Sequence, residues 1–257
     1  MFRPRIIPVL LLKGDGLVKT RQFQKDNARY IGDPINAVKI FNDLETDELV
    51  FLDILASLRD HCISLELVKK IGDEAFMPFA VGGGIKTLDD IYRLLHAGAE
   101  KVILNTAAFQ TPRLIREAAD RFGSQSIVVS IDIRKRLTGR EEVMMLGGTV
   151  KTGLSPDEAA VRMMDLGAGE LMIHSIDRDG QMRGYDTALL RRISNKVTVP
   201  VVACGGAGNP GHMKEAVREG GAHAVAAGSV FVFHGPRKAV LINYPEKNEL
   251  NSLFSET

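Results

Sequence analysis

Part of this 257-residue chain is repeated at a constant spacing. The segment Gly32–Ile54 resembles Leu154–Ile176, and each residue of the second copy follows its counterpart by 122 positions. The same offset places Gly83-Gly84 on Gly205-Gly206. Such a repeat constrains the fold, because a duplicated unit predicts two structurally equivalent halves. We therefore expect two homologous halves, about residues 1–122 and about residues 123–257.

Each half alternates short apolar runs with amphipathic stretches. The apolar runs are typical of buried parallel strands, and the stretch Leu88–Ala99 carries its apolar residues on one helical face, as a covering helix does. Counting gives four strand–helix units per half, which predicts a single TIM (βα)₈ barrel. An open doubly wound sheet is the alternative, but it predicts no twofold repeat of this kind. The expected strands lie near residues 6–12, 48–54, 78–83, 101–105, 127–133, 170–176, 200–204 and 224–229.

Two polar segments interrupt this alternation. Residues 14–33 are expected to form a long polar loop on the catalytic rim, and residues 134–148 a small hairpin that turns at Thr138-Gly139. Long connections in a compact domain usually carry function. The tail after residue 233 is expected to be an extended segment followed by a short helix.

Composition excludes several classes of protein. A formal net charge of +1 argues against nucleic-acid binding, which usually needs a strong basic bias. No apolar run is long enough to cross a membrane. Cys62 and Cys204 show neither metal-ligand nor disulfide spacing, so we expect a cytoplasmic protein without a metal or another cofactor.

Glycine pairs follow the third strand of each half. Paired glycines let backbone N–H groups approach an anion, and a following helix adds a favourable field. Tight turns without a ligand are the simpler interpretation, but recurrence in both halves favours two phosphate sites. The motif that begins at Gly206 also fits the G-x-G-x-x-G pattern, but no acidic residue ends the next strand, as a dinucleotide site would require. The phosphate candidates are Gly83, Gly84, Asn105, Thr106, Asp179, Gly180, Gly205, Gly206, Gly228 and Ser229.

Four carboxylates stand at predicted strand ends: Asp53, Asp132, Asp177 and Asp179. Asp132 lies inside an apolar run, where burial raises the pKa of a carboxyl and suits it to proton transfer. Pairing with a lysine or arginine of a neighbouring strand is an equally common role for one aspartate. His174 also stands at a strand end, but a lone histidine is more often a core residue than a ligand.

Four charged residues stand at the opposite ends of the strands: Arg5, Glu48, Lys101 and Glu170. Two basic and two acidic side chains there can close a ring of salt bridges. Chemistry at this face of a barrel usually concerns stability, so a structural plug is the generic interpretation. A gate into the barrel is the more specific one.

Several motifs together cover nearly the whole chain: "DELVFLDI", "VGGGI", "KVILNTAA", "FGSQSIVVSID", "GAGELMIHSIDRDG", "GYDT" and "CGGAG". With them the chain resembles the cyclase (HisF) subunit of imidazole glycerol phosphate synthase. The resemblance implies a glutaminase (HisH-like) subunit on the amino-terminal face, from which ammonia passes through a four-residue charged gate and along the barrel axis. It implies a substrate with two phosphates. The gate corresponds to Arg5, Glu48, Lys101 and Glu170, and a flexible-loop catalytic lysine corresponds to Lys19.

One catalytic position departs from that family. Its ring closure uses two aspartates, at the ends of strands one and five; the second corresponds to Asp132, but the first falls on Leu11. Leucine cannot transfer a proton, and loss of an acid–base group typically costs about 10²- to 10⁴-fold in rate. Asp177 is the candidate for a replacement acid.

The stretches "IIPVLLLKGDGLVKT", "RYIGDP" and "FHGPRKAVLINYP" resemble the HisF-related branch that makes acetamidino groups on surface-polysaccharide (lipopolysaccharide O-antigen) sugars with a glutaminase and a separate amidotransferase. The predicted function is an ammonia-accepting synthase subunit that serves a phosphorylated or nucleotide-sugar substrate. The alternative is a working lyase/cyclase of histidine biosynthesis, which converts a ribulosyl-formimino bis-phosphate and ammonia to imidazole glycerol phosphate and aminoimidazole carboxamide ribotide. A third possibility is a partner-free (βα)₈ isomerase of a phosphorylated sugar.

Overall fold

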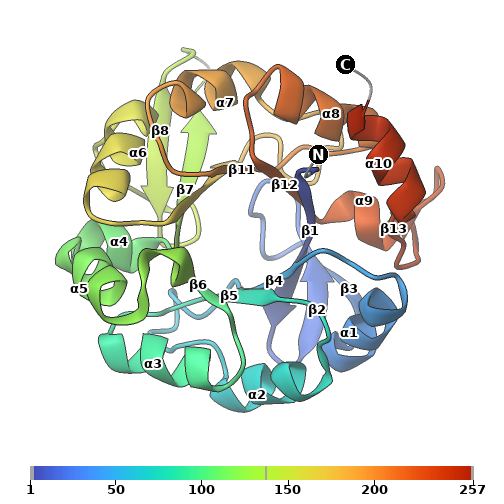
Figure 1. The fold of residues 1–257 in the computed structure, drawn as a ribbon, viewed down its shortest axis with the longest axis horizontal. Coiled ribbons are helices and arrows are strands. Elements are labelled where there is room, and N and C mark those ends of the chain that lie inside the picture. Colours follow the sequence, from blue (N-terminus) through green and yellow to red (C-terminus); the bar gives the residue numbers. More distant parts are fainter. Residues whose placement is uncertain (1–2, 137, 256–257) are drawn as a thin grey trace.

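Eight parallel strands close into a barrel in the computed structural model, which describes residues 3–136 and 138–255 (Figure 1). Each strand pairs with the next, and β10 pairs with β7 to complete the ring. The predicted TIM (βα)₈ fold is confirmed. The barrel strands are β1 (Arg5–Lys13), β4 (Leu49–Asp53), β5 (Phe79–Gly82), β6 (Lys101–Leu104), β7 (Ile127–Lys135), β10 (Glu170–Ser175), β11 (Val201–Cys204) and β12 (Ala224–Ala227).

Helices surround the barrel and cover its outer surface (Figure 1). Several begin at a side-chain cap; Thr87 and Asp90, for example, form a reciprocal capping box at the start of α3. The helices are α1 (Pro34–Asp43), α2 (Leu65–Glu74), α3 (Leu88–His96), α5 (Arg113–Phe122), α6 (Pro156–Asp165), α7 (Thr187–Ser194), α8 (Pro210–Arg218) and α10 (Lys247–Ser255), with the shorter α4 (Thr106–Gln110), α9 (Ser229–Val232) and the 3₁₀ turn η1 (Ser124–Ser126).

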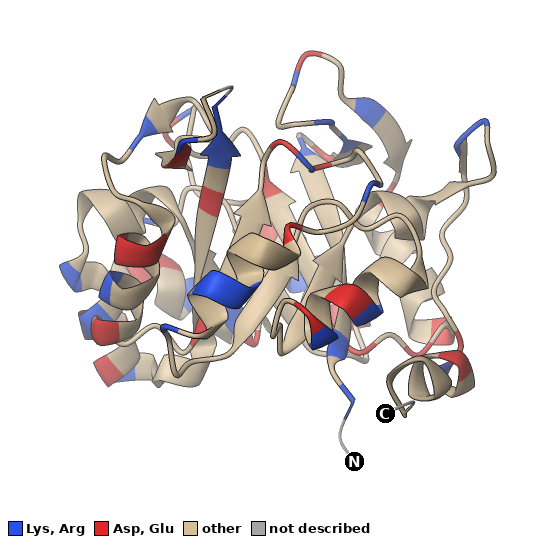
Figure 2. Cartoon of the chain, turned by 90° about the horizontal axis from the view of Figure 1, so that it is seen from above, with Lys and Arg blue, Asp and Glu red and all other residues tan. Residues whose placement is uncertain are grey.

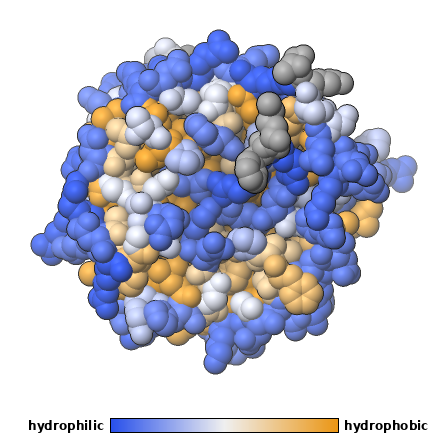
Figure 3. Space-filling view, viewed as in Figure 1, coloured by the Kyte–Doolittle hydropathy of each residue, from blue (hydrophilic) through white to orange (hydrophobic). Residues whose placement is uncertain are grey.

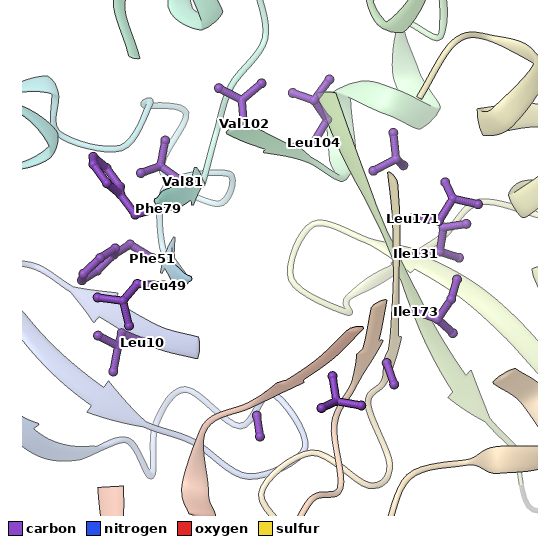
Figure 4. Close-up of a cluster of buried hydrophobic side chains, with 14 of the residues drawn as sticks. Leu10, Leu49, Phe51, Phe79, Val81, Val102, Leu104, Ile131, Leu171 and Ile173 are labelled. Atoms are coloured by element: carbon purple, nitrogen blue, oxygen red, sulfur yellow. The ribbon is translucent and has the colours of Figure 1, made fainter. Parts of the chain in front are cut away.

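The hydrophobic side chains divide into two layers. The larger one lies between strands and helices, where residues such as Phe51, Phe79 and Ile131 project outward from the barrel (Figure 4). The smaller one includes Ile7, Val50 and Val128, whose positions alternate along the strands with those of the outer layer. Because neighbouring strand residues point to opposite faces, this smaller cluster fills the inside of the barrel.

The polar segment after β1 differs from its prediction as a loop. It contains two short strands, β2 (Gly16–Lys19) and β3 (Arg29–Gly32), which pair antiparallel, and β2 also pairs with β1. Leu17 and Val18 are buried. Burial of these two apolar residues holds the segment against the barrel. Its otherwise polar composition is the reason that the sequence predicts a loop.

The predicted hairpin after strand five is present. β8 (Glu141–Met145) pairs antiparallel with β7 and with β9 (Val150–Lys151). The tail forms a second small sheet, β13 (Phe233–His234) with β14 (Ala239–Val240), before α10. Figure 2 shows the strand arrowheads pointing away from the side where both chain ends lie. The long excursions therefore surround the carboxyl ends of the strands.

Candidate active site

A pocket of about 260 Å³ opens at the carboxyl ends of the barrel strands. Its walls come from strand ends and from the segments that directly follow them. Asp132 and Lys19, two of the three predicted catalytic residues, line it, and Leu11 does too. All the phosphate candidates also line it: Gly83, Gly84, Asn105, Thr106, Asp179, Gly180, Gly205, Gly206, Gly228 and Ser229. We call this pocket the mouth.

Backbone packing requires several of the mouth glycines. A Cβ on Gly84 would stand 1.8 Å from the carbonyl oxygen of His61, and one on Gly206 would stand 2.2 Å from that of Gly184. Gly84 has a φ of +65°, which side chains other than glycine's rarely adopt. Packing thus explains these glycines on its own, and phosphate binding at them stays a prediction.

The short helices α4 and α9 begin at the mouth in the same way. The N-cap residue of α4, Asn105, makes no side-chain capping hydrogen bond to a helix N–H, and that of α9, Gly228, has no side chain to make one. The Asn105 amide instead donates to the carbonyl oxygens of Ser130 (3.1 Å) and Met144 (3.3 Å). The first N–H groups of a helix need partners from outside it, and an anion can supply them. Both halves of the barrel offer such a helix start at the mouth.

Asp132 is the buried acid of this site. Ser130 Oγ donates to Asp132 Oδ1 at 2.8 Å. Burial raises the pKa of Asp132, against the opposing effects of His174 and of this hydrogen bond. The carboxyl therefore holds a proton more readily than an exposed aspartate, which suits a group that exchanges protons.

Lys19 belongs to β2 and reaches back over the mouth. Its side chain is 5% exposed, and burial lowers the pKa of its amine although Asp179 opposes the shift. A Cβ on Gly228 would lie 1.7 Å from Lys19 Nζ, so the glycine provides the space for the amine. The β2–β3 excursion thereby supplies a cationic side chain to the same pocket as Asp132.

His174, which the sequence reasoning set aside, lies among the mouth's charged groups. It is 5% exposed, its Nδ1 lies 3.9 Å from Asp132 Oδ1, and its Nε2 lies 3.5 Å from Asp179 Oδ1. The ring meets Phe23 edge to face, with centroids 4.8 Å apart. Burial disfavours the imidazolium, but the Cys204 sulfur and the Asp179 carboxylate raise the pKa of His174 well above its usual value. Side chains alternate between the two faces of a strand, so His174, four residues after Glu170 on β10, points to the same inner face. This alternation is the sequence signal that could have identified His174 as inward-facing.

Asp177 lies outside the mouth, although it was a predicted catalytic residue. Its Oδ2 accepts a hydrogen bond from the Lys135 backbone N–H at 2.5 Å, and it does not line the pocket. Asp177 follows the end of β10, so strand alternation no longer directs its side chain inward. The structure therefore does not place it where the carboxylate missing at Leu11 would act.

Leu11 stands in apolar surroundings. It is 6% exposed and belongs to the inner hydrophobic cluster, together with Val9, Val18 and the partly buried Leu52. Asp53, another carboxylate at the mouth, is held by the turn that follows β4, since its Oδ1 accepts from the N–H groups of Leu55 (2.9 Å) and Ala56 (3.0 Å). Within residues 3–136 and 138–255, none of the carboxylates that line the mouth belongs to β1, where Leu11 stands.

At the opposite end of the barrel, the four predicted gate residues form a closed ring. Arg5 bonds to Glu48 and to Glu170. Lys101 Nζ completes the ring at 3.1 Å from Glu48 and 3.2 Å from Glu170. All four stand at the starts of β1, β4, β6 and β10. We call this arrangement the base ring.

The inner hydrophobic cluster lies between the base ring and the mouth. Ser130, which is buried on β7 between Val128 and Asp132, adds a polar group to this interior, and the buried members of the cluster itself are apolar apart from the Cys204 thiol. They are Ile7, Val9, Leu11, Val18, Val50, Ala80, Ile103, Val128, Met172, Val202, Cys204, Ala224 and Ala226.

Neither a metal centre nor a membrane span emerges from residues 3–136 and 138–255. No three His, Cys, Asp or Glu side chains within these ranges cluster as metal ligands would, and both cysteines are free. Within the same ranges no helix has the length and apolar character needed to traverse a bilayer.

Comparison with known proteins connects this geometry to a family. The profile of a family described as "Histidine biosynthesis protein" matches residues 5–236. A protein of Leptospira borgpetersenii named "Putative imidazole glycerol phosphate synthase subunit HisF" is 47% identical over 255 residues, which cover 99% of this chain and all of the relative. Similarly named subunits, hisF2 of Pseudomonas aeruginosa and hisF3 of Vibrio vulnificus, are 49% and 45% identical, over 98% and 97% of this chain and 99% and 95% of their own lengths.

Proposed function

Because the chain belongs to the histidine biosynthesis protein family and is a HisF-like subunit, we propose that it accepts ammonia from a HisH-like glutaminase and carries it through the barrel to the mouth. The ammonia then serves an amination other than imidazole ring closure. One combination carries this proposal: the base ring is complete, whereas the mouth has Leu11 opposite Asp132.

The inner hydrophobic cluster supports transport of an uncharged molecule. An isolated ion loses far more solvation free energy than a neutral molecule when it enters apolar surroundings. Ammonia could cross between the base ring and the mouth, whereas ammonium would be rejected. The base ring consists of two cations and two anions, so its formal net charge is zero. It therefore presents no net charge to a neutral molecule that passes.

The amino-terminal face supports docking of a protein partner. Figure 3 shows this face, on which hydrophobic patches lie between a hydrophilic perimeter and a hydrophilic centre. Phe76, in the turn between α2 and β5, is 89% exposed there. Exposed aromatic residues on a face that surrounds a charged centre are typical of protein interfaces. We assign this face to the glutaminase.

The finer function follows from the resemblance to the HisF-related branch. We infer that the delivered nitrogen enters an acetamidino group of a surface-polysaccharide sugar, with a separate amidotransferase completing the reaction in the cytoplasm. The acceptor would be a phosphorylated compound or a nucleotide sugar, held by the backbone groups around Gly83, Gly205 and the starts of α4 and α9.

Reconstitution tests this function against the cyclase alternative. The full chain is combined with the HisH-like glutaminase of the same organism, glutamine and the ribulosyl-formimino bis-phosphate. We expect a stable complex and glutamine hydrolysis, with imidazole glycerol phosphate formed at least roughly 100-fold more slowly than an intact acid–base pair would allow.

Two results would contradict the proposal. Imidazole glycerol phosphate formation at an ordinary enzymatic rate, or rescue of a cyclase-deficient histidine auxotroph, would establish the cyclase alternative. Failure to bind the glutaminase would leave a partner-free barrel enzyme as the better explanation. A Lys101→Met variant gives a further check, because it should keep the complex but disturb transfer of glutamine nitrogen.

A further inference from the structure

Two polar atoms at the mouth lack hydrogen-bond partners within the described part of the chain. Asp179 Oδ2 is buried without a hydrogen-bond partner there, and His174 Nε2 is buried and makes no hydrogen bond, although its ion-pair partner Asp179 Oδ1 lies 3.5 Å away. A buried polar atom without a partner costs free energy, so each such atom in a folded protein requires an explanation. His174 and Asp179 both line the mouth, so a molecule bound there would lie against these two residues.

The groups around His174 define which ligand atom would fit. Asp132 faces Nδ1 from β7, Asp179 faces Nε2 from the turn after β10, and Cys204 faces the ring from β11. The positive charge of Lys19 acts to lower the pKa of Asp179, and that of Lys25 acts to lower the pKa of Asp132. An oxygen atom can accept from Nε2, and if it is a hydroxyl it can also donate to Asp179.

The geometry points to His174 as a substrate-contacting proton-transfer residue, which binds a carbonyl or hydroxyl oxygen of a phosphorylated ligand together with Asp179. Asp132 Oδ1 faces the other ring nitrogen at 3.9 Å. Phe23 packs on the ring and restricts its rotation. The phosphate of such a ligand would lie on the glycine segments of the same pocket.

This arrangement differs from an acid–base pair that acts across the mouth. β7 and β10 are neighbours in the barrel, so Asp132 and His174 lie on one wall, whereas Leu11 is on β1 at the far side. Groups on one wall suit chemistry at a single carbon atom. As the ammonia nitrogen bonds to a carbonyl carbon, the C=O π electrons move to oxygen, which takes the Nε2 proton. The added nitrogen returns one proton to the ring, and the product carries hydroxyl and amino groups on that carbon.

This ammonia step rests on the proposed function, but the oxygen contact does not. The test therefore uses the full chain without a glutaminase. The histidine rings are labelled with ¹⁵N, and the His174 signals are assigned by their loss in His174→Gln. Ribulose 5-phosphate is the probe that carries both a phosphate and a carbonyl, and inorganic phosphate is the control ligand.

We expect ribulose 5-phosphate to shift the His174 ring signals and inorganic phosphate to leave them nearly unchanged. His174→Gln should bind ribulose 5-phosphate roughly tenfold more weakly, since a hydrogen bond to a charged group is lost, and inorganic phosphate as before. Asp179→Asn supplies a second variant, because it keeps the shape and should also weaken the sugar phosphate selectively.

Three outcomes would overturn the inference: unshifted His174 signals with ribulose 5-phosphate bound, equal affinity of the native chain and His174→Gln, or no binding of ribulose 5-phosphate. None of these involves the glutaminase, so they leave the proposed ammonia transfer standing. Conversely, a failed reconstitution with the glutaminase would leave the His174 contact intact.

Discussion

Leu11 and Asp132 line the same pocket from opposite walls of the barrel. Their strands, β1 and β7, are separated by three intervening strands in either direction around the ring. A substrate in the mouth would therefore meet a carboxyl on one side and an apolar side chain on the other. Under the proposed function, this asymmetry distinguishes a subunit that delivers ammonia from one that also closes an imidazole ring.

Leu11→Asp should restore part of the missing chemistry. With an acid on both walls, we expect imidazole glycerol phosphate formation to rise at least roughly 100-fold above the native chain, measured with ammonium salts to bypass the glutaminase. Leu11→Asn is the matched control, since it has a similar shape but transfers no proton. An equal gain from both variants, or from neither, would mean that the carboxylate is not what the site lacks.

Gly84→Ala should destabilise the protein far more than Gly14→Ala. The two glycines have φ values of +65° and +63°, so the strain of the left-handed region is nearly equal. A Cβ on Gly14 meets nothing within 4 Å, whereas one on Gly84 would collide with the His61 carbonyl oxygen. We expect Gly14→Ala to cost about 1 kcal/mol and Gly84→Ala about 1–3 kcal/mol more. Urea unfolding would check this, and equal losses would refute the collision.

Glu48→Gln should weaken the base ring. Glu48 is buried and accepts from both Arg5 and Lys101, so the neutral amide leaves two cations with one carboxylate. Removing a partner from a buried ion pair costs about 3–5 kcal/mol, and the partial exposure of Arg5 reduces the expected loss to about 2 kcal/mol. Glu66→Gln, which breaks an exposed pair with Lys70, should change thermal unfolding little. Similar effects of both variants would argue against a stabilising ring.

The contribution of His174 to stability should decrease as pH rises. The folded protein raises the pKa of the imidazole, so it binds that proton more tightly than the unfolded chain does. The contribution is complete below the unfolded value of about 6.5 and is lost as pH rises through the folded value. Urea unfolding of the native chain and His174→Gln should differ most near pH 6 and least at alkaline pH. A difference that grows with pH would contradict this sign.

Phe76→Asp should weaken binding of the glutaminase. Phe76 is exposed on the amino-terminal face, and a charged side chain in the centre of an apolar interface costs binding free energy. We expect at least roughly a tenfold rise in Kd by calorimetry. Tyr30→Asp is the control: Tyr30 is 65% exposed on β3, in the excursion at the opposite end of the barrel. An equal effect at both positions would indicate nonspecific damage.

The architecture could be predicted because the repeat and the apolar runs are sequence signals that extend over many residues. Every barrel strand begins and ends within two residues of its expected bounds, and β7 with β8 forms the expected hairpin. The segment after β1 was harder, since β2 has only four residues and its burial depends on pairing with β1. The half-barrel boundaries stay a prediction.

The site was predictable where strand geometry determines direction. Asp132 faces the mouth because it continues the inward alternation of Val128 and Ser130 along β7. The same alternation runs from Glu170 through Met172 to His174, although a lone histidine, judged by residue type alone, is more often a core residue. Asp177 follows the strand, where alternation gives no direction, and its side chain lies outside the mouth, where it accepts a hydrogen bond from the backbone N–H of Lys135 at the end of β7.

The apolar lining inside the barrel also affects the protonation state of the nitrogen that is carried. If only neutral ammonia passes Val50, Val128 and Met172, each nitrogen sheds its extra proton on the glutaminase side before it enters. The mouth would then receive a neutral nucleophile, which gains a surplus proton only once its nitrogen has bonded to carbon, and a group at the mouth must accept that proton.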